Sequence, residues 1–365
     1  MRSRQFTLGF ILLLACGALG YVRAQSATPA PKTPIRVITN EVSVPVTVTN
    51  RRGDMVLDLT PDDFHVFDDG VEQKIDRWEL GGDPLAVALV IDTDSRLHAV
   101  APEIHSIGII FTDTVMALDS EAAVLTYDSS VTVRQSFTTN HESVEKAIEA
   151  ANFNGDEMDL YDGMAAGVRS LETQPPKWHR VLLVVGESQD SRSAARLDQI
   201  VRDAERADIS IYILSVSSAG ADLKALRLDP TPLKIRGVPP ITTSGCTGPV
   251  RYGDSQCIDL AGPALWLLER GTNAIKHHQL EVAAAATGGI DYSGFRATAL
   301  QSALDRVGSE LHAQYIVDFR AKTNSAPGFH VLRVTVSQQD VAVRARPGYY
   351  FVKRQGRTEN LQTAK

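Results

Sequence analysis

The chain has 365 residues, of which 43% are hydrophobic and 22% charged, and its formal net charge is -7. This composition is typical of globular protein and excludes a disordered, collagen-like or coiled-coil chain. Because the chain is acidic and has no run of basic residues, it offers no electrostatic surface for a polyanion, and we expect no nucleic acid among its partners.

The first 24 residues predict a cleaved export signal. Two arginines precede an apolar run over 6–15, and Val22-Arg23-Ala24 has the small or aliphatic residues that a signal peptidase reads. Two alternatives stay open: the run is a membrane anchor, or Cys16 ends a lipoprotein signal. We expect an exported protein, periplasmic or extracellular, with no transmembrane span after cleavage. Residues 25–34 then form a proline-rich linker.

Two of the three cysteines, Cys246 and Cys257, lie in a stretch over 244–260 that is rich in Gly, Ser, Thr and Pro. In an oxidising compartment a disulfide that closes so short a loop contributes about 3 kcal/mol in the chain-entropy model. The other reading, two free thiols, requires that the chain stays in the cytosol. We predict that Cys246 and Cys257 form a disulfide within a loop insert over 227–260.

Both ends of the mature chain show the alternating pattern of half-buried strands. Strands are predicted at 35–48, 55–57, 64–66, 75–80, 315–319, 331–336 and 341–345. An Asp-Asp-Gly sequence at 68–70 predicts a hairpin turn. Because neither flank has enough strands to be stable alone, we predict one discontinuous β domain over 35–82 and 312–352, followed by a flexible tail over 353–365.

The middle of the chain, 83–311, alternates continuous apolar runs with helical patterns. The runs predict parallel strands buried on both faces, at 86–91, 122–125, 181–185 and 209–216. Helices are predicted at 99–116, 143–151, 160–171, 195–207 and 300–311. The predicted fold class is α/β: a doubly wound, mainly parallel, Rossmann-like sheet inserted in a small β-sandwich-like domain built from both flanks. Ligands of such sheets bind beyond the carboxyl ends of the strands.

Several of these segments resemble a known family. Val-Ile-Asp-Thr-Asp-Ser at 90–95, Leu-Tyr-Asp at 160–162 and Leu-Leu-Val-Val-Gly-Glu at 182–187 resemble a von Willebrand factor A (VWA) domain. Val-Phe-Asp-Asp-Gly-Val-Glu-Gln-Lys-Ile at 66–75 and Arg-Ala-Arg-Pro-Gly-Tyr-Tyr at 344–350 resemble the acidobacterial-type VWA-related exported proteins. The resemblance implies protein interaction or adhesion rather than catalysis, so we expect no enzyme.

The resemblance also implies a metal-ion-dependent adhesion site, in which an Asp-x-Ser-x-Ser loop, a Thr and an Asp hold Mg²⁺ through oxygens. Asp92 keeps the first ligand of that pattern. The other positions depart from it: Asp94 and Arg96 replace the serines, Met158 replaces the Thr, and the last Asp falls at Gly186 or, shifted by one, at Glu187. The guanidinium of Arg96 repels a cation and can pair with Asp92 or Asp94. We predict a degenerate site and no cofactor.

Two readings of these loops stay open. In one, the weak metal candidates Asp92, Asp94 and Glu187 belong to an acidic rim that binds Mg²⁺ or Ca²⁺ loosely. In the other, Asp92 only caps a helix or closes a loop. The candidate residues of the ligand-binding loops are Asp92, Asp94, Ser95, Arg96, Met158, Asp159, Glu187 and Ser188.

Catalytic motifs are incomplete in this sequence. The segment 186–190 lacks the second glycine of Gly-x-Ser-x-Gly, and His277 and His278 are neighbours rather than an i, i+4 pair for zinc. The predicted function is therefore that of a secreted or periplasmic VWA-domain protein that binds another protein, which the sequence does not identify. The alternative is a structural or assembly component of a cell-envelope complex, with inert loops at the strand ends.

Overall fold

The computed structural model describes residues 41–81, 84–116, 119–216, 279–295, 299–321 and 327–351. All of them belong to the unit Thr39–Lys365. The predicted signal, linker, disulfide, loop insert and tail lie outside the described residues. The described strands form one six-stranded sheet and two four-stranded sheets.

The central sheet is mainly parallel, and most of its strands are buried on both faces. In spatial order its strands are β10 (Asp291–Phe295), β9 (Ile209–Val216), β8 (His179–Gly186), β5 (Leu85–Asp92), β6 (Glu121–Tyr127) and β7 (Val131–Thr138). Only β7, at one edge, runs antiparallel to its neighbour. Every residue of β5, β8 and β9 is buried, which explains why these strands appear in the sequence as continuous apolar runs.

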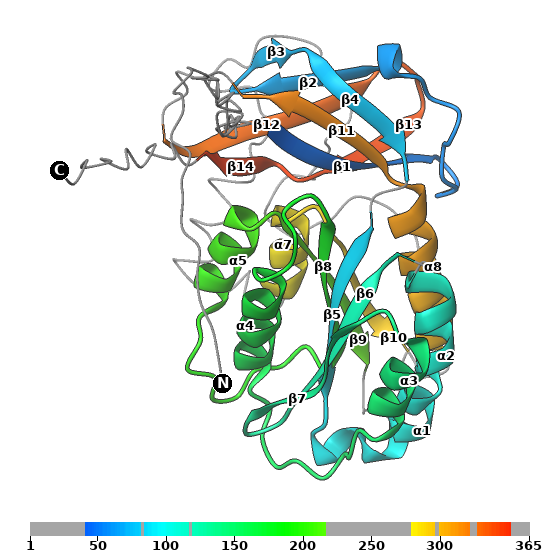
Figure 1. Ribbon diagram of the computed structural model, residues 1–365, viewed down its shortest axis with the longest axis vertical. Coiled ribbons are helices and arrows are strands. Elements are labelled where there is room, and N and C mark those ends of the chain that lie inside the picture. The colour runs from blue at the N-terminus through cyan, green and yellow to red at the C-terminus, as the bar shows by residue number, and fades with distance from the viewer. Residues whose placement is uncertain are drawn as a thin grey trace, which may run out of the picture. The chain divides into compact units, whose positions relative to one another are not determined.

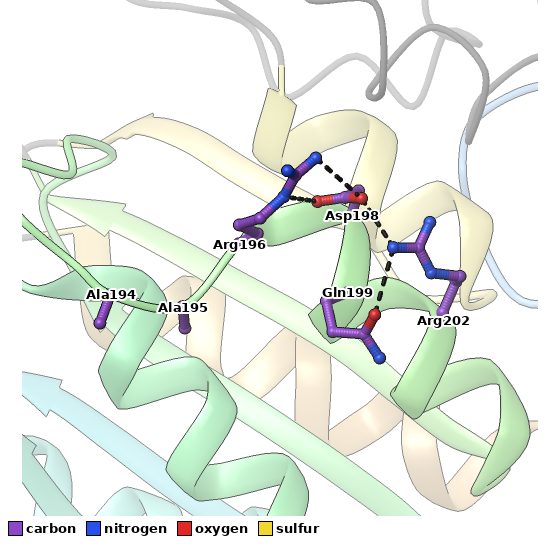
Figure 2. Close-up of a pocket in the computed structure, with 6 residues that line it drawn as sticks. All are labelled: Ala194, Ala195, Arg196, Asp198, Gln199 and Arg202. Atoms are coloured by element: carbon purple, nitrogen blue, oxygen red, sulfur yellow. Dashed lines mark hydrogen bonds and ion pairs between the residues drawn. The ribbon is translucent and has the colours of Figure 1, made fainter.

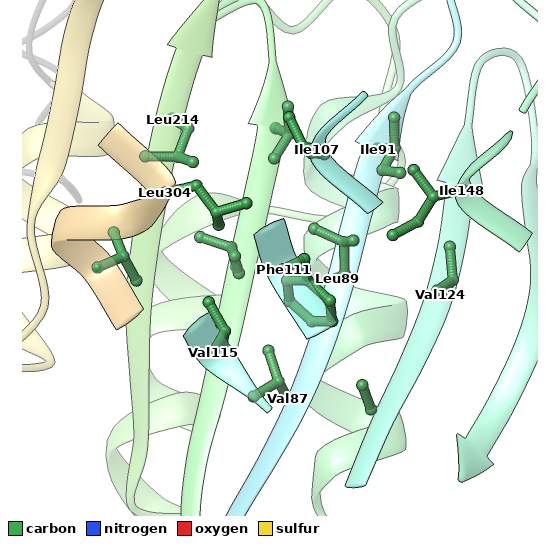
Figure 3. Packing of buried hydrophobic residues seen from close by; sticks show 14 of the residues in the cluster. Val87, Leu89, Ile91, Ile107, Phe111, Val115, Val124, Ile148, Leu214 and Leu304 are labelled. Atoms are coloured by element: carbon green, nitrogen blue, oxygen red, sulfur yellow. The ribbon is translucent and has the colours of Figure 1, made fainter. Parts of the chain in front are cut away.

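Helices cover both faces of this sheet (Figure 1). One face carries α4 (Leu160–Leu171), α5 (Leu197–Arg206) and α7 (Gln279–Ala286), and the other carries α1 (Ala101–His105), α2 (Ile107–Ile110), α3 (His141–Glu149) and α8 (Leu300–Ala313). Successive residues of β5 point to opposite faces. Leu89 packs in one cluster with Phe111 and Leu304 (Figure 3). Val90 packs in the other cluster with Met164. The predicted doubly wound fold is confirmed.

The two flanks of the chain together build the two smaller sheets. One contains β13 (Val341–Ala345), β1 (Glu41–Asn50), β11 (Tyr315–Arg320) and β4 (Ile75–Leu80), and the other β14 (Gly348–Phe351), β12 (Gly328–Val336), β2 (Phe64–Asp68) and β3 (Val71–Gln73). Both sheets contribute to a single apolar core in which Val44, Val66 and Phe319 are buried. The β-sandwich-like part of the fold class is therefore present, with strands of both flanks in each sheet.

Some predicted elements differ from the structure. Met55 makes a single bridge to Thr49 instead of a strand at 55–57. The helix predicted over 99–116 is broken into the turn η2 (Ser95–Val100), α1, α2 and the π-helical turn η3 (Phe111–Val115), and Pro102 at the start of α1 has no N–H to continue the preceding turn. The sequence does not predict the edge strand β7, because all of its residues are at least partly exposed and no apolar run marks it.

Candidate functional site

Three loops meet at the carboxyl ends of the parallel strands: the loops after β5 and β8 and the loop before α4. The amide of Ser95 donates to the carbonyl of Gly155 at 2.8 Å, and the amide of Gly155 donates to the carbonyl of Thr93 at 3.0 Å. The amide of Ser191 donates to the carbonyl of Met158 at 2.8 Å, and the amide of Met158 donates to Oγ of Ser191 at 3.1 Å. The loop before α4 is thus fixed to both of the others.

Asp92, the last residue of β5, lies fully buried between the loop after β5 and the loop after β8. Its Oδ1 accepts the amide of Asp94 at 3.0 Å, and its Oδ2 accepts the amide of Glu187 at 3.2 Å. Burial raises the pKa of Asp92 to about 6, although these two hydrogen bonds act in the opposite direction. Both carboxylate oxygens therefore hold the loops together, as a loop-closing residue would.

Arg96 lies between two of the candidate metal ligands. Its Nε donates to Oδ1 of Asp94 at 2.7 Å, and the same oxygen accepts the amide of Arg96 at 2.8 Å. Its Nη1 is 3.8 Å from Oε2 of Glu187. The hydrogen bond with Asp94 raises the pKa of the guanidinium, which is already charged at every ordinary pH. A fixed positive charge is thus shared by Asp94 and Glu187.

The remaining positions of the expected metal site supply no oxygen ligand. The side chain of Met158 is buried. A Cβ added to Gly186 would lie 2.3 Å from Cβ of Asp92 and 2.9 Å from Oη of Tyr127, so no aspartate fits at this position. The sequence leaves two positions for the last aspartate of the pattern, 186 and 187. Only Glu187 can supply a carboxylate, because position 186 has no room for a side chain. Because Mg²⁺ requires near-octahedral oxygen ligands, the residues present do not fit this ion.

Two further candidate residues lie at the edges of the site. The hydroxyl of Ser188 hydrogen-bonds that of Ser215, which is 3.3 Å from Oδ1 of Asp291. Burial, together with the charge of Glu281, raises the pKa of Asp291 to about 7. Asp159 is buried, which raises its pKa, and its Oδ1 has no hydrogen-bond partner among the described residues.

Three residues of this arrangement carry no motif in the sequence: Tyr127, Ser191 and Asp291. Tyr127 is fully buried next to Asp92. It lies just beyond the apolar run 122–125, and this position could have been used to predict it. Ser191 and Asp291 have no such signal, because only folding brings them to Met158 and Ser215.

A hollow of about 630 Å³ lies beside the start of α5 and is lined by Ala194, Ala195, Arg196, Asp198, Gln199 and Arg202 (Figure 2). Asp198 accepts hydrogen bonds from Arg196 at 2.9 Å and from Arg202 at 2.7 Å. Burial alone would raise the pKa of Asp198, but these hydrogen bonds outweigh it and hold the pKa below its usual value. Both guanidinium groups contact this one carboxylate, so each is partly neutralised by it.

No protein-family model matches the chain, and no curated protein matches it either. Similar solved structures include an aerotolerance-related membrane protein from Bacteroides fragilis, with 12% identity and a TM-score of 0.39. The match covers 62% of this chain and 99% of the other chain. The conserved hypothetical protein BatB from Bacteroides thetaiotaomicron has 12% identity, a TM-score of 0.38 and coverages of 62% and 98%.

A third similar structure comes from Catenulispora acidiphila. It is a von Willebrand factor type A protein. Its identity to this chain is 9%, its TM-score is 0.42, and the match covers 80% of this chain and 74% of the other. All three TM-scores are below 0.5, so the doubly wound α/β fold is established by the strand order and burial described above and not by these matches. In the part of the chain that the structure describes, no helix has both the length and the apolar character needed to cross a membrane.

Magnesium should leave the melting temperature of the full-length protein unchanged at millimolar concentration. Arg96, Met158 and Gly186 stand where oxygen ligands are needed, and a ligand far below its Kd adds almost nothing to stability. Differential scanning calorimetry with MgCl2, against KCl of equal ionic strength, measures this. A saturable rise at sub-millimolar Mg²⁺ would contradict the degenerate site.

A variant with restored oxygen ligands provides the opposite test in the same measurement. Asp94→Ser, Arg96→Ser, Met158→Thr and Glu187→Asp together restore oxygen ligands, without the collision that a side chain at position 186 would cause. This variant should gain a saturable, Mg²⁺-dependent rise in melting temperature that the unmodified protein lacks.

Proposed function

We propose that the chain is an exported protein that binds another protein through its three strand-end loops, without a metal ion and without catalysis. The observation that carries this proposal is the position of Arg96, whose guanidinium contacts Asp94 and lies near Glu187. A permanent positive charge stands where the resemblance implies Mg²⁺. Partner binding at these loops therefore needs no divalent cation.

The exposed surface of these loops suits a protein partner. Exposed polar residues come from all three loops and include Ser95, Arg96, Asp156, Ser188, Gln189, Ser191 and Arg192. The backbone beneath them is fixed by the hydrogen bonds of Asp92 and Ser191, which lowers the entropy lost on binding. When partly exposed side chains are counted as well, the loops carry Asp156, Glu157, Glu187 and Asp190 against Arg96, Arg192 and Arg196, and this slight acidic excess favours a partner with a basic surface.

Added positive charge on this surface should abolish partner binding. In Asp156→Arg/Gln189→Arg, two exposed positions gain a long cationic side chain, which opposes a basic surface by repulsion and by bulk. The recovery of co-purifying envelope proteins from the native host, quantified by mass spectrometry, should fall at least about tenfold, a loss on the order of 1.4 kcal/mol. Chelator should leave the recovery with unmodified protein unchanged.

The matched control is Thr132→Arg/Ser136→Arg, which also introduces two arginines, at exposed positions of the edge strand β7. This control should retain the partner. Equal recovery with both double variants would mean that the strand-end loops are inert, as expected of a structural component of an envelope complex. Loss of the partner on chelation would refute a metal-free site.

A further inference from the structure

A second group of titratable side chains lies in the β sandwich, outside the strand-end loops. Asp68 ends β2, Asp69 forms the turn into β3, and His330 lies on β12. Nδ1 of His330 is 2.9 Å from Oδ2 of Asp69 and 3.3 Å from Oδ1 of Asp68. One nitrogen and two carboxylate oxygens therefore face one another, all within 4.8 Å.

The other oxygen of each carboxylate is held by a protein donor. Oη of Tyr349 donates to Oδ2 of Asp68 at 3.2 Å, and the amide of Val331 donates to Oδ1 of Asp69 at 2.9 Å. The ring of His330 stacks on that of Tyr349, with 5.3 Å between centroids and 22° between planes. The three side chains are thus oriented before any ligand arrives, as the outer contacts of a metal site orient its ligands.

Asp68 provides a second, independent observation on this group. The residue is only 7% exposed, and its Oδ1 has no hydrogen-bond partner among the described residues. A buried carboxylate oxygen without a donor costs free energy, and a bound cation would remove that cost.

We propose that Asp68, Asp69 and His330 form a binding site for Zn²⁺, with water as the fourth ligand on the exposed side of Asp69. Zinc binds nitrogen and carboxylate oxygen at about 2.0–2.2 Å, so two of its ligands lie about 2.9 Å apart at a right angle and about 3.4 Å apart at the tetrahedral angle. The separations of 2.9 and 3.3 Å from Nδ1 of His330 match this range.

The donor set selects against the hard cations. Imidazole nitrogen suits zinc and other transition metals, whereas Mg²⁺ and Ca²⁺ prefer oxygen. Ca²⁺ also needs bonds of about 2.3–2.6 Å and six to eight oxygens, more than this group supplies. Zn²⁺ is therefore the probe that fits best.

Zinc at this position would link the two flanks of the chain. Asp68 and Asp69 belong to the sequence Val-Phe-Asp-Asp-Gly of the N-terminal flank, and Tyr349 to Arg-Pro-Gly-Tyr-Tyr of the C-terminal flank. The hydrogen bond from Tyr349 to Asp68 joins these two motifs directly. The ion would fix the β2–β3 turn against β12.

Zinc competes with a proton for Nδ1 of His330. A metal ion binds imidazole only through a nitrogen that carries no proton, so the two exclude each other at this atom. Zinc binding should therefore release protons and weaken as the pH falls. A purely structural ion pair would show neither effect.

Isothermal titration calorimetry of the full-length, chelator-treated protein with ZnCl2 tests the proposal. The unmodified protein should bind one Zn²⁺ at this site, with proton release visible as a dependence of the heat on buffer ionisation enthalpy. Asp69→Asn and His330→Gln should each lose this binding event. Asp69 is exposed, and asparagine tolerates its positive φ of 49°, so the first variant keeps the fold. Tyr349→Phe should weaken binding by about tenfold.

His65→Gln is the matched control. His65 lies on the same strand, β2, and its Nδ1 is 2.8 Å from Oε1 of Glu72, so it pairs with one carboxylate rather than two. This variant should bind Zn²⁺ like the unmodified protein, as should Asp92→Asn in the strand-end loops. Equal affinity in Asp69→Asn and His330→Gln, or no Zn²⁺ binding at millimolar concentration, would overturn the proposal.

Discussion

Arg344→Met should lower the free energy of unfolding by about 3–5 kcal/mol, because it leaves a buried carboxylate without its cation. Nη2 of Arg344 is 2.5 Å from Oε1 of Glu310, and Nη1 donates to the carbonyl of Gly288 at 2.7 Å. Glu310 is 7% exposed and also accepts hydrogen bonds from Tyr212 at 2.6 Å and from Gln314 at 3.2 Å. These donors are neutral and cannot replace the charge of Arg344.

Urea-induced unfolding at neutral pH measures this loss. The matched control is Arg51→Met, which removes an arginine from an exposed ion pair with Asp340 and should cost less than about 1 kcal/mol. Arg344→Met/Glu310→Gln should recover part of the loss, since it removes the unpaired charge. If Arg344→Met costs no more than Arg51→Met, the pair with Glu310 does not stabilise the fold.

The free energy of unfolding should also fall as the pH rises from about 4.5 to about 8, because of Glu205 on α5. Glu205 is 4% exposed, and neither carboxyl oxygen has a hydrogen-bond partner among the described residues. Burial raises its pKa from 4.5 to about 8, although Arg346, Arg202 and Arg206 act in the opposite direction. The folded protein thus keeps a proton that the unfolded chain loses above pH 4.5.

The sign follows from proton linkage. Between the two pKa values the folded state binds more protons than the unfolded state, so stability decreases with pH by up to about 1.4 kcal/mol per unit. Glu205→Gln should reduce this slope, leaving the part due to Asp92 and Asp291, and be the more stable protein at pH 8. Glu142→Gln, at an exposed glutamate paired with Lys146, should keep it. Parallel slopes for all three proteins would show that Glu205 ionises normally.

Much of the central sheet can be predicted from the sequence because burial on both faces leaves an unmistakable pattern. The predicted strand at 209–216 and helix at 160–171 coincide with β9 and α4. The edge strand β7 cannot be predicted from the sequence, because an exposed edge strand tolerates polar residues and shows no apolar pattern. It pairs with β6, which does show an apolar run. Pairing partners are likewise hidden: β4 follows β3 in the chain but pairs with β11 in the other sheet.

The candidate site, too, can be predicted from the sequence only in part. The identities of Asp92, Arg96 and Met158 are enough to predict a degenerate metal site. They do not reveal that Arg96 contacts Asp94 and lies near Glu187, because that geometry depends on loop closure by Gly155 and Ser191. The lack of space at Gly186 follows from Asp92 and Tyr127, which are distant in sequence.

The chain enters and leaves the α/β body through two neighbouring strands. β4 ends at Leu80, which pairs with Tyr315 at the start of β11, and the amide of Gly81 donates to the carbonyl of Gln314 at 2.7 Å. A body attached in this way has two covalent tethers at one point, so it cannot swivel about a single linker. Tension applied at the strand-end loops would be divided between both tethers, and the hydrogen-bonded ladder beyond them would carry the load into the sandwich.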